Sequence, residues 1–150
     1  MIAWLTVTLA MVGQAQQAHP GGTILSPFIY QTAFTRGFSP ATLIWDVPTQ
    51  FPDGSNPPYE PRNYDGKFHG PMTVRVALSN SFNIPAVKAL EFVGIYDDPN
   101  TPKQEGLIGM AQRLGITSLT RNDYGLSLTL GGGDVSLIDM TSAYSVFANG

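Results

Sequence analysis

The feature that most constrains this chain is a turn-rich stretch at residues 38–72, where Pro, Gly, Asn and Asp recur. Proline fixes φ and lacks a backbone N–H, and the other three residues favour turns, so this composition opposes long helices and strands. We therefore predict that residues 38–72 are mostly loop. A loop of this length in a compact domain is usually functional or packed by its own aromatic side chains. The aromatic residues available for such packing are Phe51, Tyr59, Tyr64 and Phe68.

Helix signals surround this stretch. Ser26-Pro27 predicts a helix with a capping hydroxyl and Pro at its first position, and Gly37 predicts its end. Later helices are predicted from near Thr73, from Pro85 to Gly94, from the capping box Thr101-Pro102-Lys103-Gln104 to Gly115, and from Ser136 to Ala148. The last has an apolar stripe of Leu137, Met140, Tyr144 and Phe147. A short extended segment, Ser127 to Leu130, is predicted before the turn Gly131-Gly132-Gly133.

The apolar residues 1–13 allow two interpretations. The small residues of Ala15-Gln16-Gln17-Ala18 would suit cleavage of a secretory signal, but such a signal normally begins with positive charge. The first basic residue here is Arg36. We favour a buried strand over residues 2–12, because large apolar and β-branched side chains dominate it. No apolar run reaches the roughly 18 residues needed to span a bilayer.

Length and charge bound the possibilities further. The chain of 150 residues suffices for one domain with one core, and we find no internal repeat and no second domain. Its net charge is −3 and its eight Lys and Arg residues are scattered, which argues against a nucleic-acid partner. The absence of cysteine excludes disulfides and thiolate chemistry. His19 and His69 lack the spacing of a metal pair, so we treat both as ordinary polar residues and predict no metal site.

The strongest candidate for chemistry is the segment Ser79-Asn80-Ser81-Phe82-Asn83-Ile84-Pro85. It separates two predicted apolar helices, where polar side chains can point into a cleft. The hydroxyl of Ser81 and the carboxamide of Asn83 would suit proton relay beside recognition of a substrate carbonyl. However, a helix–helix junction also uses Ser, Asn and Pro as caps. From spacing alone the structural interpretation is the stronger one.

Two longer stretches carry a family resemblance, namely Tyr59-Glu60-Pro61-Arg62-Asn63-Tyr64-Asp65-Gly66-Lys67-Phe68-His69-Gly70-Pro71 and Arg75-Val76-Ala77-Leu78-Ser79-Asn80-Ser81-Phe82-Asn83-Ile84-Pro85-Ala86-Val87. Both resemble the middle of the transpeptidase domain of bifunctional, class A penicillin-binding proteins. Residues 9–13 resemble the strand before that family's nucleophile, and residues 128–133 and 140–150 resemble its downstream segment. The resemblance implies an α/β (α+β) fold of the serine β-lactamase and D,D-transpeptidase kind. Residues 1–150 would form an incomplete version of it, with an antiparallel sheet beside a helical subdomain.

The family's signature comprises three motifs, S-x-x-K, S-D-N and K-T-G. Ser81-Phe82-Asn83 resembles the second motif in an S-x-N form. The resemblance implies that Ser81 relays a proton and that Asn83 binds the substrate peptide or the β-lactam side chain. The third motif, which helps to bind the substrate carboxylate, is expected downstream of Gly150.

The first motif is degenerate. The family has Pro-Gly-Ser-x-x-Lys-Pro-Phe, whereas residues 20–28 read Pro-Gly-Gly-Thr-Ile-Leu-Ser-Pro-Phe, one residue longer. Alignment on Pro27-Phe28 places Thr23 at the nucleophile and Ser26 at the lysine. Alignment on Pro20-Gly21 places Gly22 and Leu25 there instead, and the first Lys of the chain is Lys67. A hydroxyl nucleophile needs a neighbouring base, so acylation should fall by several orders of magnitude.

The resemblance implies acyl transfer in peptidoglycan cross-linking, with the D-Ala-D-Ala stem peptide as substrate, β-lactams as inhibitors and no cofactor. The expected setting is the outer face of a bacterial cytoplasmic membrane, reached through an anchor upstream of this chain. Three hypotheses remain open. The chain is an active acyltransferase whose sequence is incomplete or in error, a non-catalytic relative that binds peptidoglycan or a partner, or a fragment without independent function.

Overall fold

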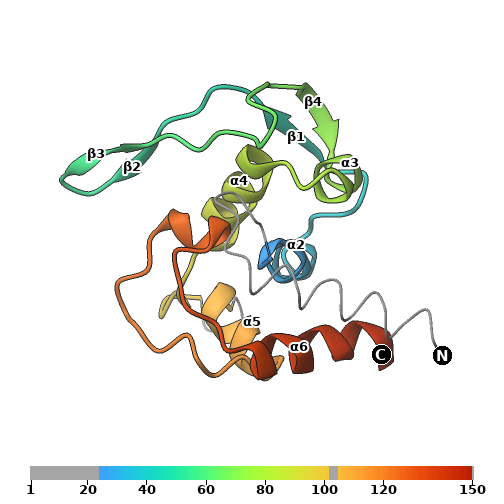
Figure 1. Cartoon of the computed structure of the whole chain (residues 1–150), viewed down its shortest axis with the longest axis vertical. Helices are drawn as coiled ribbons and strands as arrows, with labels where there is room; N and C mark the ends of the chain where they lie inside the picture. The colour runs from blue at the N-terminus through green and yellow to red at the C-terminus, as the bar shows by residue number, and fades with distance from the viewer. Residues whose placement is uncertain (1–23, 102–104, 150) are drawn as a thin grey trace.

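The computed structural model describes residues 24–101 and 105–149 (Figure 1). The predicted strand at residues 2–12, the alternative signal segment, Thr23 and residues 102–104 of the capping box lie outside the described residues. The elements, in chain order, are α2 (Ser26–Thr35), β1 (Leu43–Asp46), β2 (Phe51–Asp53), β3 (Asn56–Tyr59), β4 (Gly70–Thr73), α3 (Val74–Ser79), α4 (Asn83–Val93), α5 (Leu107–Arg113), the 3-10 helix η1 (Leu126–Leu130) and α6 (Leu137–Asn149). None of these described helices is long and apolar enough to cross a membrane.

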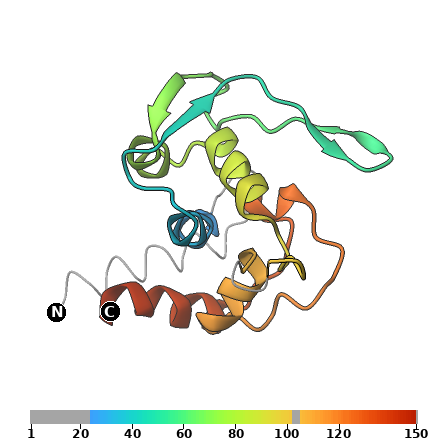
Figure 2. The same cartoon turned by 180° about the vertical axis from the view of Figure 1, so that it is seen from behind.

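Helices α2 and α4 form the centre of the molecule and pack against each other. Phe28, Ile29 and Ala33 of α2, and Leu90 and Val93 of α4, are each at most 1% exposed. Burial of a large apolar side chain contributes about 1.5–3 kcal/mol, so the buried side chains at this contact stabilise the fold. Helices α5 and α6 lie on one side of the pair, and β1, β4 and α3 lie on the other (Figure 2).

Helix α6 is attached to α2 through an aromatic cluster. The Phe28 ring lies 5.0 Å from Tyr144 and 5.3 Å from Phe147, centroid to centroid. The Tyr144 hydroxyl donates to the Ile24 carbonyl at 2.8 Å, and burial raises the pKa of Tyr144 to about 12. The predicted helix is confirmed, but its stripe is buried only in the middle. Met140 is 5% exposed, whereas Leu137 and Phe147 are 38% and 46% exposed.

The prediction that residues 38–72 are mostly loop is confirmed, although four short strands, which the sequence did not reveal, begin within them. β1 pairs antiparallel with β4, with Leu43 opposite Thr73 and Asp46 opposite Gly70. β2 pairs antiparallel with β3 to form a hairpin that projects from the body (Figure 1). The predicted aromatic packing is present in part, since Phe51 is 1% exposed whereas Tyr64 is 87% exposed. Turn-rich composition hid the strands because each is only three or four residues long.

Three predictions of local structure need correction. Ser26 is not a cap: Leu25 occupies the cap position, no side chain caps it, and Ser26 is buried in the first turn. α5 begins at Leu107, after the predicted capping box. Residues 127–130, predicted to be extended, form part of the 3-10 helix η1. The turn at residues 131–133 is confirmed: Gly131 has φ +95°, and a Cβ on Gly133 would lie 2.6 Å from the Leu128 side chain.

Candidate functional site

The Ser81-Phe82-Asn83 segment begins where helix α3 ends. The Ser81 N–H donates to the Leu78 carbonyl and the Phe82 N–H donates to the Ala77 carbonyl, each at 3.1 Å. These two bonds are the pattern of a Schellman motif, in which the residue after the cap adopts a left-handed conformation. Glycine normally occupies that position, but here Ser81 has φ 55°, the only positive φ at a described non-glycine residue. The Ser81 side chain is exposed to solvent. A strained backbone conformation at an exposed residue is typical of functional sites.

Asn83 opens helix α4 and is 2% exposed. Its backbone N–H donates to Asn63 Oδ1 at 2.8 Å, and its Nδ2 donates to the Arg62 carbonyl at 2.6 Å. Its Oδ1 is buried and has no hydrogen-bond partner among the described residues. The carboxamide is therefore held rigidly, and it offers one acceptor for a donor that comes from elsewhere.

A buried carboxylate lies behind this segment. Asp46, at the end of β1, has a side chain that is 0% exposed. Its Oδ2 accepts from Asn63 Nδ2 at 2.7 Å, from the His69 N–H at 2.9 Å and from His69 Nδ1 at 2.7 Å. A buried charge is tolerated only when it is paired and hydrogen-bonded. The three donors satisfy Oδ2, whereas Oδ1 is buried and has no hydrogen-bond partner among the described residues.

His69 connects this carboxylate to the motif. Its ring stacks on Phe82 with a centroid distance of 4.1 Å and an interplanar angle of 24°. Its Nε2 lies 3.1 Å from Asp65 Oδ2. The Lys67 N–H lowers the pKa of Asp65, and the nearby His69 lowers it further. The imidazole therefore lies between two carboxylates while one of its faces covers the middle residue of the S-x-N segment.

Lys88 of helix α4 also lies within electrostatic reach of this carboxylate. Its Nζ donates to the Trp45 carbonyl at 2.8 Å, beside Asp46 in β1. Partial burial lowers the pKa of Lys88, and the attraction of Asp46 opposes that shift. The hydrogen bond joins α4 to β1.

The structure places the two first-motif candidates differently. Thr23 lies outside the described residues. Ser26 is 3% exposed in the first turn of α2, and its Oγ has no hydrogen-bond partner among the described residues. It therefore makes no hydrogen bond to Ser81 or Asn83. Since a neutral serine hydroxyl is a poor proton acceptor, Ser26 does not replace a lysine base at this position.

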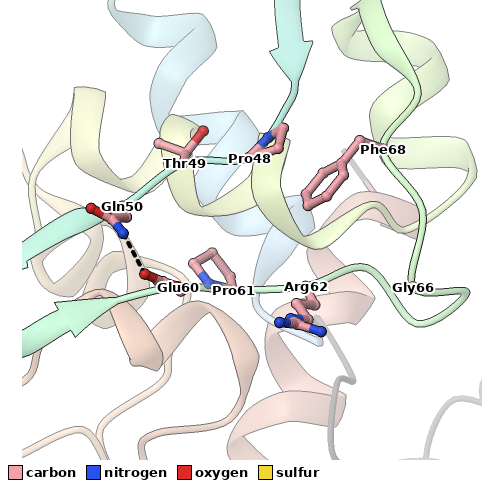
Figure 3. Close-up of a pocket in the computed structure, with 8 residues that line it drawn as sticks. All are labelled: Pro48, Thr49, Gln50, Glu60, Pro61, Arg62, Gly66 and Phe68. Carbon is pink, nitrogen blue, oxygen red and sulfur yellow. Dashed lines mark hydrogen bonds between the residues drawn. The ribbon is translucent and has the colours of Figure 1, made fainter.

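An open pocket of about 610 Å³ borders the same network (Figure 3). Two antiparallel segments form its walls, and Gln50 donates to Glu60 Oε1 across them at 2.5 Å. Arg62 is one of the lining residues, and its carbonyl accepts from Asn83 Nδ2. The lining residues are Pro48, Thr49, Gln50, Glu60, Pro61, Arg62, Gly66 and Phe68. Among the described residues no group of three His, Asp or Glu side chains could hold a metal ion.

Sequence reasoning selected Ser81 and Asn83 but missed Asp46, Asn63 and His69. Asn63 and His69 were within the stretch that carried the resemblance, and His69 was treated as an ordinary polar residue. Asp46 follows the alternating pattern of strand β1, in which Ile44 and Asp46 are buried and Leu43 and Trp45 are exposed. A carboxylate on the buried side of a strand is a usable signal, because buried charges need partners.

No protein-family model matches the chain. It is 38% identical over 130 residues to penicillin-binding protein 1C of Escherichia coli strain K12, which covers 85% of this chain and 15% of that protein. It is 32% identical over 142 residues to penicillin-binding protein 1A of Neisseria cinerea, covering 91% of this chain and 16% of that protein. The chain thus spans only about a sixth of the length of these relatives.

Solved structures agree with this similarity. Penicillin-binding protein 1A of Haemophilus influenzae matches with a TM-score of 0.69 and 30% identity over 86% of this chain and 18% of that chain. Penicillin-binding protein PonA1 of Mycobacterium tuberculosis matches with a TM-score of 0.64 over 89% of this chain and 35% of that chain. The latter is 22% identical and therefore supports the fold alone. The expected fold class, mixed helix and antiparallel sheet of the transpeptidase kind, is confirmed.

Proposed function

We propose that this chain, which belongs to the family of penicillin-binding proteins 1A and 1C, is the part of a D,D-transpeptidase domain that presents the second catalytic motif. The family acts in peptidoglycan synthesis in the bacterial cell envelope. The observation that carries the proposal is the geometry of residues 81–83. Ser81 is exposed in a strained left-handed conformation, and Asn83 is fixed through both its backbone and its side chain.

The proposed substrate is a peptidoglycan stem peptide that ends in D-Ala-D-Ala. In the full reaction a serine oxygen attacks the carbonyl carbon between the two D-Ala residues, and the C–N bond breaks. The departing D-Ala takes a proton, and an amine of a neighbouring stem peptide then takes the acyl group from the serine. A β-lactam acylates the same serine. The proposed location is the outer face of the cytoplasmic membrane.

In this chain the second motif would contribute to that reaction in two ways. The Ser81 hydroxyl can accept and donate a proton, which suits relay to the departing amine. Asn83 Oδ1 has no partner among the described residues and could accept from a peptide N–H once the groups that bury it move aside. Neither residue is proposed as the nucleophile, and neither alignment of residues 20–28 with the S-x-x-K motif, on Pro27-Phe28 or on Pro20-Gly21, places a lysine there. We propose that the chain as written recognises the peptide without being acylated.

The second candidate function is that of a non-catalytic relative that binds peptidoglycan or a partner protein. One observation favours it, namely that the backbone N–H and Nδ2 of Asn83 both have partners, while Ser26 Oγ has none among the described residues. The two candidates share the peptide-binding step and differ in covalent chemistry.

The test is a titration of the isotope-labelled chain with a short peptide that ends in D-Ala-D-Ala, followed by NMR. We expect saturable shifts at Ser81 and Asn83, and none with the L-Ala-L-Ala control peptide. Identical responses to both peptides, or no response at these two residues, would refute the proposed recognition.

Intact-mass analysis after incubation with penicillin tests the covalent step. We expect no added mass, because no lysine occupies the first motif. An adduct that maps to Thr23 or to any serine would show that another group acts as the base.

A further inference from the structure

We propose that Asp46, Asn63 and His69 form a positioning network that sets the conformation of the Ser81-Phe82-Asn83 segment. The network reaches the segment along two routes from one carboxylate oxygen, Asp46 Oδ2. The claim about conformation stands by itself, whereas its consequence for peptide recognition rests on the proposed function.

The first route passes through the carboxamide of Asn63. A carboxylate only accepts hydrogen bonds, so Asp46 obliges Asn63 to turn its Nδ2 toward it. Asn63 Nδ2 also donates to the Lys67 carbonyl at 2.8 Å, which a carboxamide oxygen could not do. Asn63 Oδ1 must then face the other way, where it accepts the Asn83 N–H at 2.8 Å. The acceptor oxygen at position 46 thus determines which Asn63 atom meets the motif.

The second route passes through the imidazole of His69. Nδ1 donates to Asp46 Oδ2 at 2.7 Å, and the backbone N–H of the same residue donates to the same oxygen at 2.9 Å. These two bonds fix both the ring and its backbone. The ring face then stacks on Phe82 at 4.1 Å. Asp65 lies 3.1 Å from Nε2 and restrains the far edge of the ring.

The two routes end on consecutive residues, Phe82 and Asn83, directly after the strained Ser81. A left-handed serine persists only where its surroundings over-determine it. On its other side, helix α3 ends through the bonds of Ser81 and Phe82 to Leu78 and Ala77. The segment is therefore held between the end of α3 and the network. The network residues Asp46, Asn63 and His69 lie in β1 and the turn-rich stretch, not in the helices on either side of the motif.

The test compares variants of the whole 150-residue chain by NMR and amide hydrogen exchange. Asn63→Ala removes the acceptor of the Asn83 N–H. We expect this amide to exchange about fivefold to tenfold faster, the worth of one net hydrogen bond. We also expect the Ser81 carbon shifts to move away from left-handed values, while amides of α2 keep their rates. Asn56→Ala, at the exposed hairpin where Asn56 bonds Asp53, is the matched control and should change neither signal.

Two further variants separate positioning from general folding. Asp46→Asn keeps a side-chain oxygen for Asn63 and His69, whereas Asp46→Ala does not. We expect the NMR signals of Ser81 and Asn83 to stay close to their wild-type positions in Asp46→Asn. In Asp46→Ala we expect both signals to move away from those positions. If Asn63→Ala fails to fold, His69→Ala, at a side chain 30% exposed, takes its place and should shift the Phe82 and Ser81 signals.

The ligand arm uses the D-Ala-D-Ala peptide on the same variants. The affinity of Asn63→Ala for the peptide should be about tenfold weaker than that of wild type. Its unfolding midpoint should stay close to that of the Asn56→Ala control. Unchanged Ser81 and Asn83 signals in Asn63→Ala and in His69→Ala would overturn the positioning role. Changed signals without any peptide binding by the wild-type chain would leave the positioning role in place and refute the proposed function instead.

Discussion

Replacement of Ser81 by glycine should stabilise the chain, because Ser81 holds a backbone conformation that glycine adopts freely. A left-handed conformation costs an L-residue about 1–2 kcal/mol, and Ser81 has φ 55°. The greater flexibility of glycine in the unfolded chain offsets about 0.5–1 kcal/mol of that gain. The net expectation is a stabilisation of about 0.5–1 kcal/mol, or about 1–4 °C in Tm for a domain of this size.

The assay is urea unfolding followed by circular dichroism, with Ser81→Ala as the matched control. Ser81→Ala removes the same hydroxyl and keeps the Cβ that makes the conformation costly, so the difference between the two variants isolates the backbone. We expect Ser81→Gly to be the more stable of the two and to bind the D-Ala-D-Ala peptide more weakly than wild type, the usual exchange of stability for function. If Ser81→Gly is no more stable than Ser81→Ala, the strain attributed to this residue does not exist.

Two other predictions address the core and the pH dependence. Leu90→Ala, at a fully buried position in α4, should cost about 2–5 kcal/mol in chemical denaturation, and a loss below 1 kcal/mol would contradict the central role of the α2–α4 contact. Hydrogen bonds from Ser118 and Thr117 lower the pKa of Asp139 to about 2. Because this pKa is depressed in the folded state, the stabilisation is present above the ordinary Asp pKa and is lost as pH falls toward 2. Urea midpoints of Asp139→Asn should therefore vary less than those of wild type between pH 4 and pH 2, and parallel curves would refute the assignment.

Much of the helical part was predictable because its signals are local. Thr73 caps α3 by accepting from the Val76 N–H at 3.4 Å, and Gly94 ends α4 with φ 75°. Gly37 ends α2 in the same left-handed manner. Each of these interactions joins residues only a few positions apart, so residue type and spacing are enough to indicate them.

Ser26 shows where local signals fail. A serine before a proline favours a helix cap, yet this serine lies inside the first turn and is 3% exposed. Ser26 is buried by residues distant in sequence. The residues next to it in the chain therefore give no sign that it is buried. The strand pair β1–β4 was missed for a related reason, because its partners, residues 43–46 and 70–73, are separated by most of the turn-rich stretch.

The sequence by itself therefore indicated most of the helices, and it predicted an S-x-N motif at Ser81 and Asn83 and a first motif without lysine. Only the tertiary structure decided how that motif is held. Asp46, Asn63 and His69 are common polar residues of turn-rich chain, and nothing in their order says that two of them bond to one buried oxygen of the third. Folding of β1 against β4 brings the Asp46 carboxylate into that position, and its need for donors as a buried charge then orients the other two side chains.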